Sequence, residues 1–200
     1  MTRMTGLGAL AALAALAACS SDSGGGDPPP PSYTAYEAQA VALMDDWRET
    51  PATDPGSLPY AGGGTYEGVL YGDISSGDSY LTTLAGDLTL DVDFSTNTNA
   101  VTGEVTDIVD SAGYGLGGEL AISGTFIDRT AETGQNESFG GTLTGTLTSE
   151  DLGDTSVAGT INGDFLGDDL GAVSGDVAAT LSQSSGFYTL DGNFIAQGTE

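Results

Sequence analysis

The sequence predicts an all-β protein, a single eight-stranded antiparallel up-and-down barrel that is water-soluble and carries one short N-terminal α-helix. Glycine makes up 32 of the 200 residues, which disfavours a helix bundle because each helix-interior glycine costs about 1 kcal/mol. A five-residue pattern (apolar, any, Gly, any, apolar) recurs eight times between Tyr66 and Phe194. The intervals between its glycines fit one strand and a short turn, and they are too short for crossover helices.

The pattern also predicts which face of each strand is buried. Because side chains alternate along a strand, the two apolar residues and the glycine share one face, and the intervening positions share the other. Those intervening positions are polar except at Val69, Ala85 and Ala158. A barrel that spans the outer membrane requires the reverse arrangement, so we expect a polar outer face and a filled interior. A two-sheet sandwich with the same alternation is the alternative. The eight copies are Tyr66–Leu70, Leu84–Leu88, Val101–Val105, Ile122–Phe126, Leu143–Leu147, Val157–Ile161, Val173–Val177 and Leu190–Phe194.

The chain begins with features of a lipoprotein signal peptide. Arg3 precedes the apolar stretch Leu7–Ala18, which is too short to span a membrane. The stretch ends in Leu16-Ala17-Ala18-Cys19, which resembles a bacterial lipobox. Residues 1–18 are therefore interpreted as a signal peptide and Cys19 as the site of lipidation, with palmitate among the expected acyl groups. An ordinary secretory signal with a chance cysteine is the alternative. The segment resembles the Gram-negative lipoprotein sorting pattern, in which Asp after the cysteine implies inner-membrane retention; Ser20 therefore implies delivery to the outer membrane, with the barrel facing the surface or the periplasm.

A tether and one helix are expected before the barrel. Residues 19–33 are rich in Ser, Gly and Pro, which is typical of a lipidated linker. Residues 34–49 are predicted to form an amphipathic helix that begins with a capping box of Thr34 and Glu37. Prolines then end the helix, so residues 34–59 form the helix and connector, and residues 60–198 form the barrel domain. The apolar stripe of the helix, which we expect to contribute to a core, is Tyr36, Ala40, Leu43, Met44 and Trp47.

Composition excludes several classes of function. The chain has no His and no Lys, three Arg, one Cys and 29 acidic residues, for a formal net charge of −26. Histidine bases, Schiff-base lysines and disulfides are therefore excluded, and the deficit of positive charge argues against nucleic acid. A carboxylate pair could hydrolyse a glycosidic bond, but no acidic residue lies in a recognisable motif. We predict no enzyme activity, no catalytic residue and no cofactor.

The segment from residue 91 to residue 97 has some features of a calcium-binding loop. Asp91, Asp93, Ser95 and Asn97 supply oxygen ligands at alternate positions, but the glycine and the distal glutamate of an EF-hand loop are missing. The two aspartates also fit the outward face of a strand, and no metal site is predicted. The pair at positions 168 and 169 is interpreted in the same way.

Two loop residues are candidates for contact with a partner. Tyr114 lies within a glycine-rich loop, where it either anchors a partner or folds over the barrel opening. Arg129 is the only basic residue after the helix and could anchor an interface. The simpler alternative for Arg129 is a solvated pairing with Asp128 or Glu132.

Three short motifs near the end of the chain carry a family resemblance. They are Gly163-Asp164-Phe165-Leu166-Gly167, the run Leu170–Gly175, and Gly192-Asn193-Phe194-Ile195-Ala196. Together with the lipobox and the tether, they resemble the barrel domain of transferrin-binding protein B and its smaller surface-lipoprotein relatives, over residues 60–198. The full receptor has two lobes, whereas this chain has one barrel. The histidine of haem-binding relatives is absent, so that function does not carry over.

Three functions follow from these observations. The resemblance implies a non-catalytic outer-membrane lipoprotein that binds a protein or nutrient through loops at the barrel end. A lipocalin-like carrier of a small apolar ligand is the alternative, although the large-small-large filling predicts little internal space. A structural envelope lipoprotein is the third hypothesis.

Overall fold

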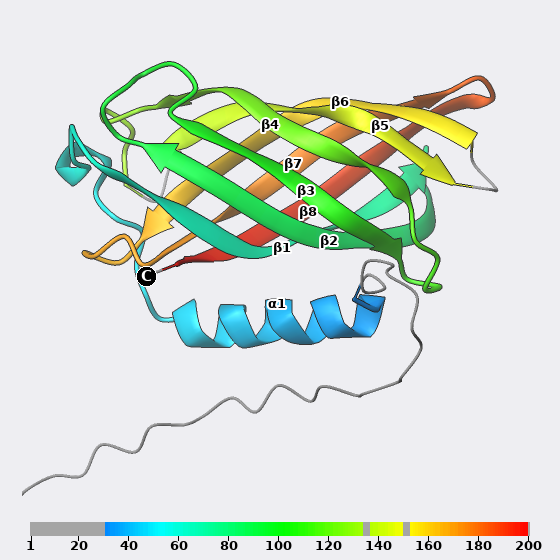
Figure 1. Cartoon of the computed structure of the whole chain (residues 1–200), viewed down its shortest axis with the longest axis horizontal. Helices are drawn as coiled ribbons and strands as arrows, with labels where there is room; N and C mark the ends of the chain where they lie inside the picture. The colour runs from blue at the N-terminus through cyan, green and yellow to red at the C-terminus, as the bar shows by residue number, and fades with distance from the viewer. Residues whose placement is uncertain (1–30, 134–136, 150–152, 200) are drawn as a thin grey trace, which may run out of the picture.

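The computed structural model describes residues 31–133, 137–149 and 153–199 and shows one helix followed by eight strands (Figure 1). The signal peptide, Cys19 and most of the tether lie outside the described residues. Among the described residues, no helix is both long enough and apolar enough to cross a membrane. The elements are α1 (Tyr33–Trp47), the 3-10 turn η1 (Pro55–Ser57), β1 (Gly63–Ser76), β2 (Ser79–Asp93), β3 (Val101–Asp110), β4 (Gly117–Ile127), β5 (Phe139–Ser149), β6 (Gly153–Leu166), β7 (Ala172–Gln183) and β8 (Gly186–Gly198).

The strands close into an antiparallel barrel in chain order. β1 pairs with β2 and also with β8, from Tyr66 opposite Gly198 to Ser75 opposite Thr189. This closing ladder leaves no edge strand, so the predicted barrel is confirmed and the sandwich alternative is wrong. The β1–β2, β3–β4, β5–β6 and β7–β8 connections share one end, which we call the mouth. The opposite end, which holds the β2–β3, β4–β5 and β6–β7 connections, is called the closed end.

The apolar residues of the repeated pattern fill the barrel interior. All of them are buried except Phe126. The central glycines leave space for larger neighbours, as Gly163 illustrates. A Cβ atom at Gly163 would lie 2.7 Å from Cζ of Phe194 and 2.8 Å from Cζ of Phe139. The large-small-large arrangement therefore allows the rings of Phe139 on β5 and Phe194 on β8 to approach each other over the glycines of β6 and β7.

The fourth copy of the pattern departs from the prediction. Phe126 is 53% exposed, whereas Thr125 is buried. The register shifts between Ser123 and Phe126, and Gly124 has a φ of +64°. The bulge exchanges the two faces of the strand, because one extra residue reverses every later side chain. Thr125 then accepts a hydrogen bond from the Val101 amide at 2.7 Å and donates one to the Val101 carbonyl, both inside the barrel.

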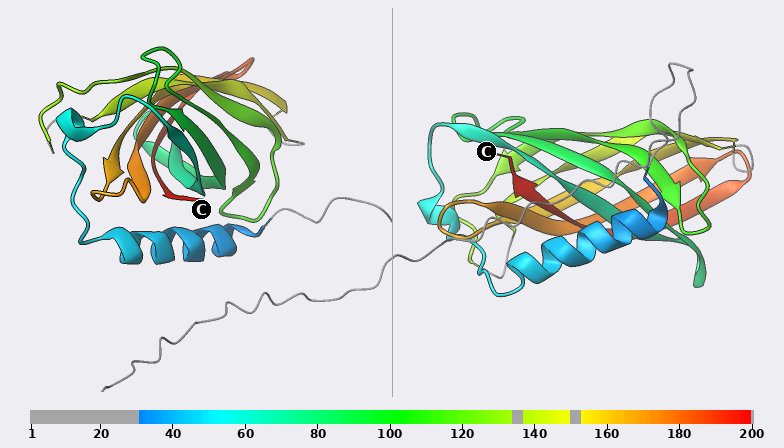
Figure 2. Two further views of the ribbon diagram at one scale, coloured as in Figure 1. Left: turned by 60° about the vertical axis from the view of Figure 1, so that its left-hand side comes forward. Right: turned by 60° about the horizontal axis from the view of Figure 1, so that its bottom comes forward.

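Helix α1 lies along the outer wall of the barrel, across β1, β2 and β8 (Figures 1 and 2). Ser32 caps it by accepting a hydrogen bond from the Ala35 amide at 3.3 Å, so the predicted capping box at Thr34 is wrong. Tyr36 and Ala40 are buried on a small apolar cluster made by Val69, Ala85 and Val109.

The rest of the helical stripe is less buried than predicted. Met44 is exposed, and Leu43 and Trp47 are half-buried, so the expected core role of Met44 is wrong. Trp47 packs on the β6–β7 turn, where a Cβ atom at Gly171 would lie 2.4 Å from Cη2 of the indole. The helix therefore covers one strip of the barrel wall and leaves the mouth open.

A candidate binding cavity at the barrel mouth

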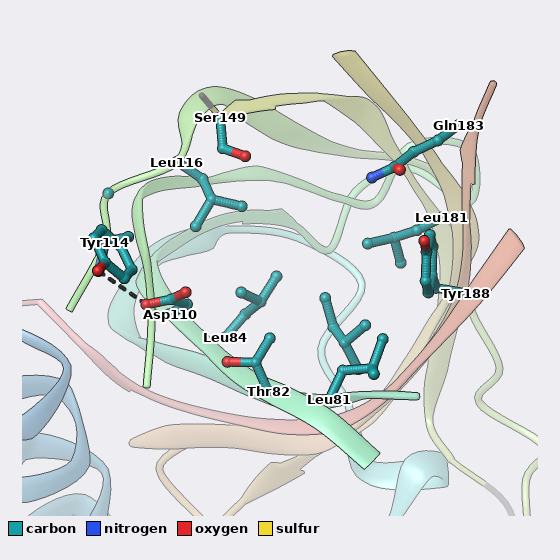
Figure 3. Close-up of a pocket in the computed structure, with 12 residues that line it drawn as sticks. Leu81, Thr82, Leu84, Asp110, Tyr114, Leu116, Ser149, Leu181, Gln183 and Tyr188 are labelled. Carbon is teal, nitrogen blue, oxygen red and sulfur yellow. Dashed lines mark hydrogen bonds between the residues drawn. The ribbon is translucent and has the colours of Figure 1, made fainter. Parts of the chain in front are cut away.

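A cavity of about 460 Å³ opens at the mouth of the barrel (Figure 3). Its lining combines aliphatic and aromatic side chains with a few polar groups. These come from the ends of β1, β2, β3, β5, β7 and β8 and from the β3–β4 loop. The lining residues are Ile74, Leu81, Thr82, Leu84, Asp110, Tyr114, Gly115, Leu116, Ser149, Leu181, Gln183 and Tyr188.

The two ends of the barrel are filled differently. At the closed end the ring of Phe165 packs against those of Phe94 and Phe139, with centroids 5.2 and 5.4 Å away. Leucine and isoleucine side chains line the mouth instead. The large-small-large pattern predicts little internal space, which holds at the closed end and is wrong at the mouth.

Hydrogen bonds within the β3–β4 loop hold Tyr114 at the rim of the cavity. The Asp110 carboxylate accepts from the Tyr114 amide at 2.8 Å and from the Ala112 amide at 3.0 Å. The Asp110 amide donates to the Tyr114 carbonyl at 2.9 Å, and the Leu116 amide donates to the Ile108 carbonyl at 2.7 Å. Figure 3 shows the link between Tyr114 and Asp110. The Tyr114 side chain remains 67% exposed in this ordered loop.

The polar groups of the lining are few and lie at different places around the wall. Asp110 is its single carboxylate, and the hydrogen bonds just described give it a loop-holding role. Gln183 donates from Nε2 to Thr155 Oγ1 at 2.8 Å. Thr82, Tyr114, Ser149 and Tyr188 add hydroxyl groups, and the remaining lining residues apart from Gly115 are aliphatic. Such a lining suits a ligand with an apolar body and at most a small polar group.

Arg129, the second predicted contact residue, lies at the closed end and is not brought near Tyr114. Its guanidinium stacks on the Tyr60 ring, 4.6 Å from the centroid. It also donates to the carbonyls of Pro59 at 2.6 Å and Phe94 at 2.9 Å. The expected pairing with Asp128 or Glu132 is absent among the ion pairs of the described residues. Arg129 therefore ties the chain entering β1 to the end of β2.

The aspartates considered for calcium have other partners. Asp91 accepts a hydrogen bond from Thr65 Oγ1 at 2.6 Å. Asp93 accepts from the hydroxyl and the amide of Ser95, and these bonds hold the pKa of the Asp93 carboxyl below its usual range. The part of the chain that the structure describes contains no group of three side chains suited to hold a metal ion.

Sequence reasoning missed most of the cavity. Leu81, Leu116 and Leu181 lie outside the eight pattern copies, and their shared position at the mouth depends on strand register and loop shape. The available signal is the distribution of residue types. The pattern's aromatic members gather at the closed end, whereas leucines dominate the strand ends at the mouth.

Comparisons with known proteins find similarity among solved structures only. No family model matches the chain, and no curated protein does. Two solved structures are similar to it, both variants of the vaccine antigen transferrin binding protein B from Haemophilus parasuis Hp5. The variant with one tryptophan replaced by alanine is 18% identical, with a TM-score of 0.42, and the match covers 74% of this chain and 28% of that one. The double variant, in which a tyrosine is also replaced, is 19% identical, with a TM-score of 0.40, over 74% and 27%. The match spans about a quarter of the length of those chains.

Proposed function

We propose that this chain is a non-catalytic, lipid-anchored binding protein of the outer membrane whose mouth cavity takes a small apolar ligand. The observation that carries the proposal is the cavity of about 460 Å³ at the mouth. Its volume falls within the roughly 300–1,000 Å³ of ligand pockets, and its lining is mainly apolar with a few polar groups. Closed barrels of eight strands hold one small ligand at most, and this cavity lies inside one end of the barrel.

The membrane anchor is the second part of the proposal. The apolar leader and the Leu16-Ala17-Ala18-Cys19 motif support lipidation at Cys19. Ser20 supports delivery to the outer membrane. The anchor would keep the barrel and its ligand at one membrane, so the protein would act as a local store or a delivery protein.

The cavity can be tested with an uncharged fluorescent probe, N-phenyl-1-naphthylamine. We expect saturable binding with enhanced emission. Leu116→Trp should weaken binding at least tenfold, because the larger side chain occupies the cavity from its half-buried position on the loop. Val41→Trp, on the exposed face of α1 and away from the mouth, is the matched control and should bind as the unmodified chain does. Equal binding by both variants would place the probe elsewhere and refute the cavity proposal.

Native mass spectrometry of the protein extracted from its own cells would identify the natural ligand. An added mass below about 500 Da that leaves on denaturation is the expected result, because the cavity holds only a small molecule. The same spectrum reports the mass of any lipid on Cys19. A bare polypeptide at Cys19 would refute the anchor.

Recognition of a protein or nutrient by the mouth loops is the second candidate function. The exposed, hydrogen-bonded placement of Tyr114 favours it, because rigid exposed aromatic side chains often anchor interfaces. The proposed contact residue on this surface is Tyr114, whereas Arg129 could act only in a separate contact at the closed end. Exchange of the β3–β4 loop with unchanged partner binding would refute this second candidate.

A further inference from the structure

We infer that the mouth of the barrel rests on the surface of a lipid bilayer, with Tyr80, Leu81, Tyr114 and Phe187 entering its interface. We call these four residues the rim. The inference rests on the proposed function, because it names the surface from which an apolar ligand would enter the cavity. It adds an interaction surface and an orientation that ligand binding alone does not require.

Exposed apolar side chains are concentrated at the mouth. Among the described residues, eight large hydrophobic side chains are exposed, and four of them form the rim. Tyr114 belongs to the β3–β4 loop, while Phe187 lies at the start of β8 and is 73% exposed. Tyr80 and Leu81 lie at the start of β2, where Tyr80 is opposite Ser75, which in turn is opposite Thr189 of β8. The rim therefore follows one side of the mouth, from β8 past β1 and β2 to the β3–β4 loop.

The other exposed apolar side chains do not form a second patch. Val41 and Met44 lie on α1, Phe126 lies on the outer face of β4, and Tyr60 lies under the guanidinium of Arg129. Tyrosine side chains favour the membrane interface, where an apolar ring lies beside water, and phenylalanine and leucine side chains enter its apolar side. The mouth is therefore the face of the described molecule best suited to lipid.

The chain enters the fold at the mouth. Tyr33, the first residue of α1, packs on the cluster that includes Val109, and Val109 bridges to Gly115 in the β3–β4 loop. The start of α1 lies beside that loop in Figure 1. Twelve residues separate Cys19 from Ser32, so covalent geometry limits their separation to about 45 Å. An anchor at Cys19 would thus keep the start of α1, and the mouth beside it, within about 45 Å of the bilayer.

Charge predicts the kind of lipid surface. Asp78 is exposed in the β1–β2 turn and Asp110 lies in the cavity wall. The two arginines of the described residues, Arg48 and Arg129, lie at the other end of the molecule: Arg48 ends α1 and Arg129 follows β4. An acidic mouth without basic side chains should favour zwitterionic lipid over anionic lipid.

The test uses the full lipid-anchored chain reconstituted in phosphatidylcholine vesicles. Phe187→Cys and Phe126→Cys each provide one thiol for a fluorophore, because Cys19 carries lipid, which the intact mass verifies before labelling. Both positions are exposed phenylalanines on the outer wall, one at the mouth and one on β4. Nitroxide-bearing lipids should quench the label at position 187 at least threefold more than the label at position 126. Anionic phosphatidylglycerol should reduce that difference.

Equal quenching at both positions, or none at either, overturns the inference. Quenching at neither position, together with a crosslink from position 187 to one membrane protein, would instead identify the rim as a protein interface. Far-ultraviolet circular dichroism establishes that both variants keep the barrel. Binding of N-phenyl-1-naphthylamine in the same vesicles separates the two proposals. Probe binding without quenching overturns only the inference that the mouth rests on the bilayer. Quenching without probe binding overturns only the proposal that the cavity binds an apolar ligand.

Discussion

Gly163 shows at the scale of one residue why the repeated pattern needs glycine. A Cβ atom there would meet the Phe194 and Phe139 rings and would also lie 2.8 Å from the Ser174 carbonyl oxygen. None of these neighbours can withdraw easily, because both rings are buried in the aromatic cluster and the carbonyl belongs to a ladder. Packing therefore requires glycine at position 163. Its backbone conformation does not, because any residue can adopt it.

Gly163→Ala should lower the free energy of unfolding by about 1–3 kcal/mol, the usual cost of overpacking a core. Gly64→Ala is the matched control, because a Cβ atom at Gly64 in β1 would meet nothing within 4 Å. Urea unfolding followed by tyrosine and tryptophan fluorescence measures both. Equal stability of the two variants would show that the rings rearrange around the added methyl group.

Phe126 marks the limit of residue-by-residue prediction from the pattern. The motif from Ile122 to Phe126 is indistinguishable from the other copies in sequence, yet the bulge turns Phe126 outward and Thr125 inward. The bulge depends on the pairing with β5 and on the positive φ of Gly124. An isolated glycine in a strand is compatible with either a bulge or regular pairing, so the alternation alone cannot choose between them.

At the scale of elements, the docking of α1 could have been read from the sequence. Val69 and Ala85 are apolar exceptions on an otherwise polar outer face, and both lie under the helix. Ala158, the third exception, is exposed. An apolar residue on the outer face therefore marks the position of the helix in two of three cases. The spacing of Tyr36 and Ala40 indicates which helix face is buried. The strands that the helix contacts can be predicted only when the apolar exceptions on the strands are combined with the spacing on the helix.

The same helix buries a polar contact beneath it. The Tyr36 hydroxyl donates to Asp87 Oδ2 at 3.0 Å and to the Asp107 carbonyl at 3.1 Å. Burial raises the pKa of the Asp87 carboxyl; the Tyr36 hydrogen bond lowers it, and the charges of Asp107 and Glu67 raise it further. Burial and the Asp87 carboxylate likewise raise the pKa of the Tyr36 phenol. The charged form of Asp87 is therefore disfavoured in the folded state.

Asp87→Asn should stabilise the fold at pH 7. The folded-state pKa of Asp87 lies above its unfolded value, so the folded state binds more protons between the two pKa values and stability falls as pH rises through that window. The destabilisation caused by the ionised Asp87 carboxylate is complete above its folded-state pKa. It is absent below about 3.8, the pKa of the unfolded state. The difference between variant and parent should therefore shrink towards zero in acid.

Urea midpoints measured from pH 7 down to pH 3 test this dependence. Glu104→Gln, at an exposed position on β3, removes the same charge without removing a half-buried carboxylate. A pH-independent difference for Asp87→Asn, or the same profile for both variants, would contradict the proposed effect of burial.

The cavity could not be predicted element by element. The strand ends that line it come from six strands, and their inward side chains meet only after the barrel closes with its particular stagger. The β3–β4 loop then supplies Tyr114 and Leu116 through hydrogen bonds within the loop. Periodicity predicts which side chains point inward, but not how much volume they leave at one end.

At the scale of the whole molecule, charge opposes folding. The chain has a formal net charge of −26, and among the described residues there is one ion pair, between Arg48 and Asp45 at the exposed end of α1. Acidic side chains on the outer face therefore repel one another with little local compensation. The folded state brings them closer together than the unfolded chain does, and this repulsion destabilises the compact form.

Salt should therefore stabilise the protein. Screening shortens the range of repulsion from roughly 20 Å near 0.02 M salt to about 4 Å near 0.5 M, so the melting temperature should rise by several degrees between these concentrations at pH 7. Sucrose of equal osmolality controls for the general exclusion of solutes, and only the part of the shift beyond its effect counts as electrostatic. The extra shift should also diminish near pH 4, where the carboxylates begin to be protonated and less repulsion remains to be screened. A melting temperature that is unchanged or lowered by salt would contradict this prediction. It would mean that the acidic side chains lie far enough apart on the barrel for water alone to weaken their repulsion.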